Sequence, residues 1–176
     1  ERIELRGRNG AGKTTLIRSL LRSAHAQPLS PIVCSTGTIE LDSKLRIGVY
    51  EQEISSHLFG KSLYDAIEAI YLGRKLPISD TKIRQLMSDY LFEQTDGGQL
   101  VDSLSGGQKA RLQLIDMFAE QPNMLVLDEP TNHLDLPSIE ELETALKRYQ
   151  GAILYVSHDS YFRDALGGEI VEITSV

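Results

Sequence analysis

Apolar residues along this chain fall into short runs that alternate with amphipathic stretches. Near the N-terminus, a short apolar run around residues 3–5 precedes a helical stripe formed by residues 16, 17, 20 and 21. Toward the C-terminus, strands are predicted at 124–127, 152–156 and 170–173, and helices at 138–149 and 158–165. Strands that alternate with helices are typical of a parallel sheet covered on both faces, so we expect an α/β fold.

The middle of the chain has a different pattern. Alternating or clustered apolar residues at 37–41 and 45–50 predict a hairpin of two antiparallel strands. Further on, apolar side chains recur at helical spacing along 63–71 and again along 83–91. We interpret both stripes as packing faces of a small helical lobe. The lobe is expected at about 53–120, between two core segments at 1–52 and 121–176.

Composition narrows the class of protein. The 176 residues are 41% hydrophobic and 24% charged, which suits one globular domain. No apolar run approaches the roughly 18 residues that span a bilayer, and no signal peptide is evident, so we expect no membrane span and a cytoplasmic location. The net charge of −7 argues against a general basic face and direct DNA binding. Because the chain starts at Glu1, two residues before a strand, we expect an N-terminally incomplete domain.

The strongest chemical signal is Gly-Arg-Asn-Gly-Ala-Gly-Lys-Thr at 7–14, a G-x-x-x-x-G-K-[ST] run between a strand and a helix. Its glycines let backbone N–H groups approach phosphate oxygens. Lys13 is expected to reach the β- and γ-phosphates, and the Thr14 hydroxyl to bind Mg²⁺. The run therefore predicts a nucleoside triphosphate site rather than a simple glycine-rich turn. The predicted binding residues are Gly7, Arg8, Asn9, Gly10, Ala11, Gly12, Lys13, Thr14 and Thr15.

A second motif, Leu-Ser-Gly-Gly-Gln at 104–108, opens a predicted helix. Ser105 and Gln108 have the spacing of a capping box, which is a purely structural explanation. Gly106 and Gly107 each weaken a first helical turn by up to about 1 kcal/mol relative to alanine, a cost expected where a group must approach the bare backbone. An anion at the positive end of the helix is one such group. The sequence leaves both explanations open.

A third motif, Met-Leu-Val-Leu-Asp-Glu-Pro at 124–130, places two carboxylates at the end of a buried strand. Ligands of open α/β sheets bind at that edge. Adjacent strand side chains point opposite ways, so separate roles are expected. Asp128 would belong to the Mg²⁺ shell, and Glu129 would orient an attacking water and accept its proton. The alternative is a polar strand end without chemistry.

These motifs, followed by Ser-His-Asp at 157–159, resemble in their order the ABC-type ATPase domain over nearly the whole chain. The resemblance implies one domain over 1–176 with a P-loop NTPase (RecA-like) core. It further implies a mainly parallel sheet, a small antiparallel β element and an inserted helical lobe, and hydrolysis of ATP with Mg²⁺. Tyr50-Glu51-Gln52 is similar to the family's glutamine loop. The implied catalytic residues are Glu129, His158, Gln52 and Lys13, and the implied metal ligands are Thr14, Gln52 and Asp128.

In ABC ATPases the signature segment of one domain completes the ATP site of another. The resemblance thus implies that Ser105, Gly106, Gly107 and Gln108 act on a nucleotide held by a second ABC domain. That domain would lie in the same polypeptide or in a homodimer. An alternative is a domain that binds ATP and pairs without turnover, against which Glu129 argues, because such sites usually lack this carboxylate.

The sequence of residues 127–135, which includes Asn132 and His133, resembles that of the ABC-F subfamily. Members of this subfamily are soluble twin-domain ATPases that act on ribosomes. It implies a role in translation or in ribosome protection against antibiotics, with ribosome contacts made by parts of the protein outside this chain. The resemblance also implies that this chain is the second ABC domain of its parent protein. The alternative is the ATP-binding subunit of a membrane transporter. One departure is that none of the six residues before Gly7 is aromatic, although ABC domains usually stack adenine on an upstream aromatic ring.

Overall fold

The computed structural model describes residues 1–8, 10–24, 41–50, 53–132 and 134–174, with only the backbone described at 22–24. The chain divides into two compact units, which are described separately. The first, here called the sheet unit, comprises Glu1–Tyr50, Pro122–Pro130 and Gln150–Val176. The second, called the helical unit, comprises Glu51–Gln121 and Thr131–Tyr149.

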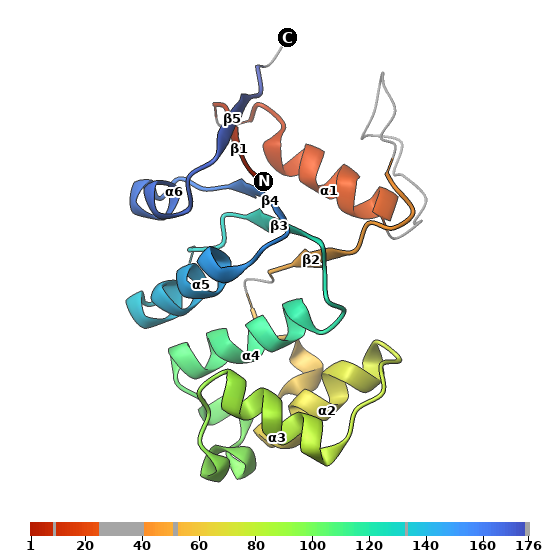
Figure 1. Ribbon diagram of the computed structural model, residues 1–176. Coiled ribbons are helices and arrows are strands. Elements are labelled where there is room, and N and C mark those ends of the chain that lie inside the picture. Colours follow the sequence, from red (N-terminus) through yellow and green to blue (C-terminus); the bar gives the residue numbers. More distant parts are fainter. Residues whose placement is uncertain (9, 25–40, 51–52, 133, 175–176) are drawn as a thin grey trace. The chain divides into compact units, whose positions relative to one another are not determined.

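The sheet unit is built on parallel strands (Figure 1). Within the described residues these are β1 (Arg2–Arg6), β2 (Ile47–Val49), β3 (Met124–Asp128), β4 (Ala152–Val156) and β5 (Glu169–Glu172). They lie in the order β2-β3-β4-β1-β5, and each neighbouring pair runs parallel. The expected α/β fold with a parallel sheet is therefore confirmed. Because the strands are parallel, all their carboxyl ends meet at one edge.

Two helices of this unit, α1 (Lys13–Ala24) and α6 (Ser160–Leu166), cover opposite faces of the sheet (Figure 1). Ile17 of α1 packs in one apolar cluster with Val126 and Val156. Tyr155 precedes Val156 in β4 and therefore points to the opposite face of the sheet, since adjacent strand side chains alternate. Its ring meets the ring of Phe162 in α6 edge-on, with centroids 6.0 Å apart. Leu16, expected on the packed stripe of the first helix, is instead 42% exposed.

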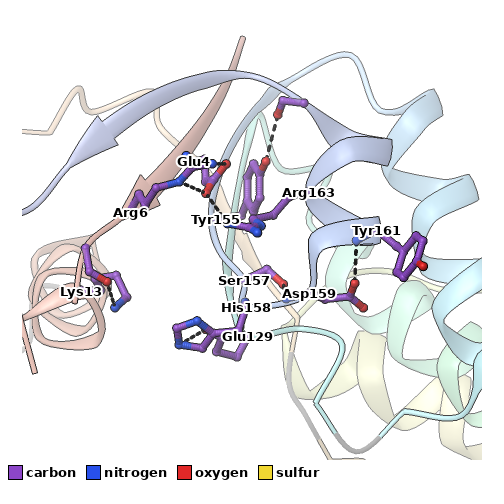
Figure 2. Close-up of polar contacts among 12 residues, drawn as sticks. Glu4, Arg6, Lys13, Glu129, Tyr155, Ser157, His158, Asp159, Tyr161 and Arg163 are labelled. Atoms are coloured by element: carbon purple, nitrogen blue, oxygen red, sulfur yellow. Dashed lines mark hydrogen bonds and ion pairs between the residues drawn. The ribbon is translucent and has the colours of Figure 1, made fainter. Parts of the chain in front are cut away.

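A buried carboxylate lies on the α6 face of the sheet. Glu4 of β1 is 5% exposed, and its two oxygens accept hydrogen bonds from Nε and Nη2 of Arg6 at 2.8 and 3.0 Å. Nη1 of Arg163, in α6, lies 3.6 Å from the same carboxylate (Figure 2). The Tyr155 hydroxyl nearby donates to the carbonyl oxygen of Gly167 at 3.1 Å. Ionic and hydrogen-bonded contacts thus tie α6 to the central strands.

The helical unit contains four α-helices and three short 3-10 helices in its described part. The α-helices are α2 (Leu63–Gly73), α3 (Asp80–Asp89), α4 (Gly106–Phe118) and α5 (Leu136–Arg148), and the 3-10 helices are Ser56–Leu58, Gln94–Gly98 and Val101–Ser103. Its core is apolar: Leu63, Ile67 and Ile83 are at most 1% exposed. Each α-helix starts at a side-chain cap, supplied by Ser62, Ser79, Ser105 and Asp135.

The sequence-based expectation can be compared with the structure at three further places. The stripe expected to continue through Tyr90 and Leu91 is wrong at Leu91, because α3 ends at Asp89 and Leu91 turns outward with φ of 58° and 69% exposure. Tyr90 is partly buried and packs against the helical core, as expected. Residues 131–149 group with the helical unit, although they were expected in the core segment 121–176. Of the expected hairpin, β2 occupies 47–49, whereas 37–40 lie outside the described residues.

Replacing the buried carboxylate should destabilise the fold. We expect Glu4→Ala to lower the free energy of unfolding by about 2–4 kcal/mol, because Arg163 and part of Arg6 lose their counter-charge. Glu169→Ala, an exposed carboxylate on β5, is the matched control and should change stability by less than about 0.5 kcal/mol. Thermal or denaturant unfolding of the purified protein measures both. Equal free energies of unfolding for the two variants would show that the Glu4 ion pairs contribute less to stability than expected here.

Candidate active site

The phosphate loop connects β1 to α1, and its glycines are required by geometry. Gly10 and Gly12 have φ of 82° and 98°, a region that side chains disfavour. Gly7 has an ordinary φ, but a Cβ atom there would lie 2.5 Å from the carbonyl oxygen of Ile173, just beyond β5. Asn9, also predicted to bind nucleotide, lies outside the described residues. Side chains are therefore disfavoured by backbone conformation at Gly10 and Gly12, where the surroundings are open, and by close packing at Gly7.

Lys13 is the first residue of α1 and lies over this loop. Its Nζ donates to the carbonyl oxygens of Gly7 and Arg8 at 2.8 and 3.1 Å, and the residue is 9% exposed. Figure 2 shows the side chain at the start of the helix. N–H groups in the first turn of a helix have no acceptor within the helix. The lysine charge and the positive helix end together favour an anionic group such as phosphate.

A carboxylate and a hydroxyl meet beside the loop. Asp128 is the last residue of β3, and Thr14 Oγ1 donates to its Oδ1 at 3.4 Å. Oxygen ligands of this kind are the ones that Mg²⁺ prefers. Within the described residues, no group of three or more His, Cys, Asp or Glu side chains could hold a metal by itself. The donor set fits Mg²⁺ bound jointly by these two residues and by nucleotide phosphates.

Glu129 leaves the strand in a strained conformation. Its φ of 50° lies in the left-handed region, which costs a non-glycine residue on the order of 1 kcal/mol. Its N–H donates to the carbonyl oxygen of Val156 at 2.9 Å, and its Oε2 accepts from the backbone N–H of His158 at 2.9 Å. Both contacts join the end of β3 to the end of β4. They hold the carboxylate at the sheet edge.

His158 follows β4 and approaches the same carboxylate through its ring. Its Nε2 lies 3.3 Å from Oε1 of Glu129, and its side chain is 65% exposed. The turn is fixed by Asp159, whose Oδ1 accepts from the N–H groups of Tyr161 and Phe162, and by Ser157 Oγ, which accepts from Asp159 N–H (Figure 2). Sequence reasoning noted both residues in the Ser-His-Asp motif but assigned them no role. The signal for Asp159 was an acidic residue at the start of the helix predicted at 158–165, which in the structure begins at Ser160 with Asp159 as its cap.

The signature segment belongs to the helical unit. Ser105 Oγ accepts from Gln108 N–H at 3.2 Å and Gln108 Oε1 accepts from Ser105 N–H at 3.0 Å, so the capping box is formed. A Cβ atom at Gly106 would lie 2.2 Å from Oδ2 of Asp135, whereas one at Gly107 would meet its nearest neighbour, Pro137 Cβ, at 3.8 Å. Packing therefore accounts for Gly106 but not for Gly107.

The structure brings several of the predicted residues together at the edge of the sheet unit. Thr14 meets Asp128, and Glu129 meets His158, at the ends of neighbouring strands. Gln52, predicted to be both catalytic and a metal ligand, lies outside the described residues. The sheet unit thus presents a phosphate loop, a metal-type donor pair and a carboxylate–histidine pair along one edge.

This fold and edge define an ABC ATPase domain. Residues 1–132 match the family model described as ABC transporter, so the chain belongs to this family. Domains of the family in general bind and hydrolyse ATP. In the described part of the chain, no helix is both long and apolar enough to span a membrane.

Relatives with known names are similar over nearly all of the chain. YdiF of Bacillus subtilis (strain 168) is 39% identical over 175 residues, which are 99% of this chain and 25% of YdiF. The ATP-binding protein Uup of Escherichia coli (strain K12) is 34% identical over 93% of this chain and 25% of Uup. The energy-dependent translational throttle protein EttA of the same strain is 32% identical over 94% of this chain and 28% of EttA. Within its family the chain is most like the ABC-F proteins, and it spans about a quarter of these relatives.

Solved structures show the same fold. A dimeric, post-hydrolysis ATP-binding cassette with ADP and Pi superposes with a TM-score of 0.67 and 19% identity, over 99% of this chain and 82% of that one. A chain from an inward-facing ABC transporter gives a TM-score of 0.73 and 22% identity, over 99% and 69%. At these identities the likeness concerns the fold alone.

The close approach at Gly7 can be tested directly. We expect Gly7→Ala to lower the free energy of unfolding by roughly 1–3 kcal/mol and to weaken ATP binding, since the loop must shift away from Ile173. Gly73→Ala, whose Cβ would meet nothing within 4 Å at the end of α2, is the control and should be neutral or stabilising. Thermal unfolding and ATP titration measure the two effects. Unchanged stability and affinity in Gly7→Ala would show that the loop has more room than the structure indicates.

Proposed function

We propose that this chain is the ATP-hydrolysing domain of a soluble, cytoplasmic ABC-F protein that acts on the ribosome. The observation that carries the proposal is the carboxylate of Glu129, held at the sheet edge by the backbone and ring of His158. The same edge carries the phosphate loop and the Thr14–Asp128 pair. A domain that only bound ATP would not need a carboxylate positioned in this way.

The chemistry follows from these positions. The triphosphate is bound by backbone N–H groups of the loop and by Lys13, and Mg²⁺ bound through Thr14 and Asp128 would neutralise phosphate charge. Glu129 orients a water and accepts its proton as the water oxygen bonds to the γ-phosphorus. The bond between the γ-phosphorus and the bridging oxygen breaks, giving ADP and phosphate. His158 contacts Glu129 and would contact the γ-phosphate. By the resemblance, Gln52, which lies outside the described residues, would bind the metal and the water.

Hydrolysis by this domain would depend on a partner domain. We propose that Ser105, Gly106, Gly107 and Gln108 face a nucleotide held by a second ABC domain. The phosphate loop of the present chain would hold the other nucleotide of this head-to-tail pair. The dimeric cassette that shares this fold supports the pairing. By its resemblance, the chain would be the second ABC domain of its parent, with the other domain in the same polypeptide.

The ribosome is proposed as the target because of the subfamily. EttA, a relative at 32% identity, is named a translational throttle protein. The wording around Asn132 and His133 points to the same subfamily. The conformational change that ATP drives in the domain pair would alter the state of the ribosome, either to control translation or to protect the ribosome against antibiotics.

The proposal is tested in the full-length parent protein with a Glu129→Gln variant. We expect ribosomes to stimulate ATP hydrolysis by the parent, and the variant to lose at least about 100-fold in turnover while still binding ATP, because it lacks the proton acceptor. The variant should then remain bound to ribosomes in the presence of ATP, as measured by co-sedimentation. Glu140→Gln, an exposed carboxylate on α5, should behave like the parent.

Two results would contradict the proposal. Turnover by Glu129→Gln equal to that of Glu140→Gln would remove Glu129 from the chemistry. Co-purification of the parent with a membrane-spanning partner, together with an ATPase rate indifferent to ribosomes, would favour a transporter subunit instead.

A further inference from the structure

One carboxylate in the helical unit reaches the first turns of two helices. Asp135 caps α5, because its Oδ1 accepts from the N–H of Ser138 at 3.1 Å and from the Ser138 hydroxyl. The same carboxylate lies against the Cα of Gly106, the first residue of α4. A Cβ at Gly106 would be 2.2 Å from Oδ2, 2.8 Å from Cγ and 2.9 Å from Oδ1. A side chain at Gly106 would require the Asp135 carboxylate to move.

The contact is confined to one glycine of the signature pair. A Cβ at Gly107 would come no closer than 3.8 Å to its nearest neighbour, which is ordinary van der Waals contact. Ser105 and Gln108 on either side of the pair are occupied with each other in the capping box. The Asp135 carboxylate therefore restricts the first turn of α4, and it does so at one position, Gly106.

Other contacts hold the two helices in this arrangement. Arg111 of α4 donates through Nε to Glu141 of α5 at 3.0 Å, and its Nη1 donates to the carbonyl oxygen of Leu91 at 2.9 Å. Hydrogen bonds from Ser138 lower the pKa of Asp135 below its usual value, so the side chain is ionised at neutral pH. A negative charge beside helix N-termini is electrostatically favourable.

We propose that Asp135 is a positioning residue for the signature segment, and that Gly106 is glycine because of Asp135 rather than because a nucleotide approaches it. The inference rests on the proposed function, in which the signature acts on ATP held by a second domain. It adds that Asp135, which follows Glu129 in the chain, sets the placement of the signature. Nucleotide contact would then fall to Ser105, Gly107 and Gln108, and to the backbone N–H groups at the start of α4, including that of Gly106.

The test is a rescue experiment in the full-length parent. We expect Gly106→Ala to reduce turnover at saturating ATP by about 10-fold or more with little change in KM for ATP, because this domain's own phosphate loop is intact. Adding Asp135→Gly should restore turnover to within about threefold of Asp135→Gly alone, since glycine is accepted at an N-cap and removes the carboxylate. Asp135→Asn keeps the shape and the cap, and it should not rescue Gly106→Ala.

Thermal unfolding of the same variants separates the possible failures. The melting temperature should fall in Gly106→Ala and recover in the double variant with Asp135→Gly. If turnover in that double variant stays far below that of Asp135→Gly alone while the parent is active, Gly106 serves the nucleotide and the inference is overturned. If the parent itself shows no ATPase activity, the proposed function fails, and the melting temperatures still decide whether Asp135 excludes a side chain at Gly106.

Discussion

The parallel pairing of β3, β4 and β1 is the constraint on which the candidate site depends. In this register Asp128 lies opposite Val156, so the residues that follow both strands emerge side by side. The N–H of Glu129 then reaches the carbonyl oxygen of Val156, and its carboxylate reaches His158. A slip of one residue would turn each of these side chains to the other face of the sheet. Strand register, more than any single side chain, therefore assembles the site.

The two units carry different parts of the chemistry. The sheet unit holds the phosphate loop and the carboxylates, and the helical unit holds the signature segment. In the sheet unit, Glu129 has a left-handed backbone held by contacts to the neighbouring strand. In the helical unit, Asp135 lies against Gly106 at the start of the signature helix. This division suits a domain that hydrolyses one nucleotide and helps to hydrolyse another.

Local signals in the sequence predicted most of the fold and the motifs of the site. The strand at 152–156 has the predicted bounds, and the Ser105–Gln108 capping box was foreseen as one of two explanations. Features that depend on partners distant in the chain were not foreseen, such as the burial of Glu4 near Arg163 and the packing of Gly106 on Asp135. The end of α3 was also missed, because helical spacing of apolar residues continues to Leu91 after the helix has stopped.

The central claim is that the ends of β1, β3 and β4 bind one Mg²⁺–ATP for hydrolysis. The most direct measurement is a structure of the full-length parent with Mg²⁺ and a non-hydrolysable ATP analogue. The account predicts phosphates bound by the backbone of residues 10–14 and by the Lys13 side chain. It places the metal on Thr14 and Asp128, with the γ-phosphate facing Glu129 and His158. A triphosphate bound away from this edge, or a γ-phosphate that Glu129 cannot reach through one water, would contradict it.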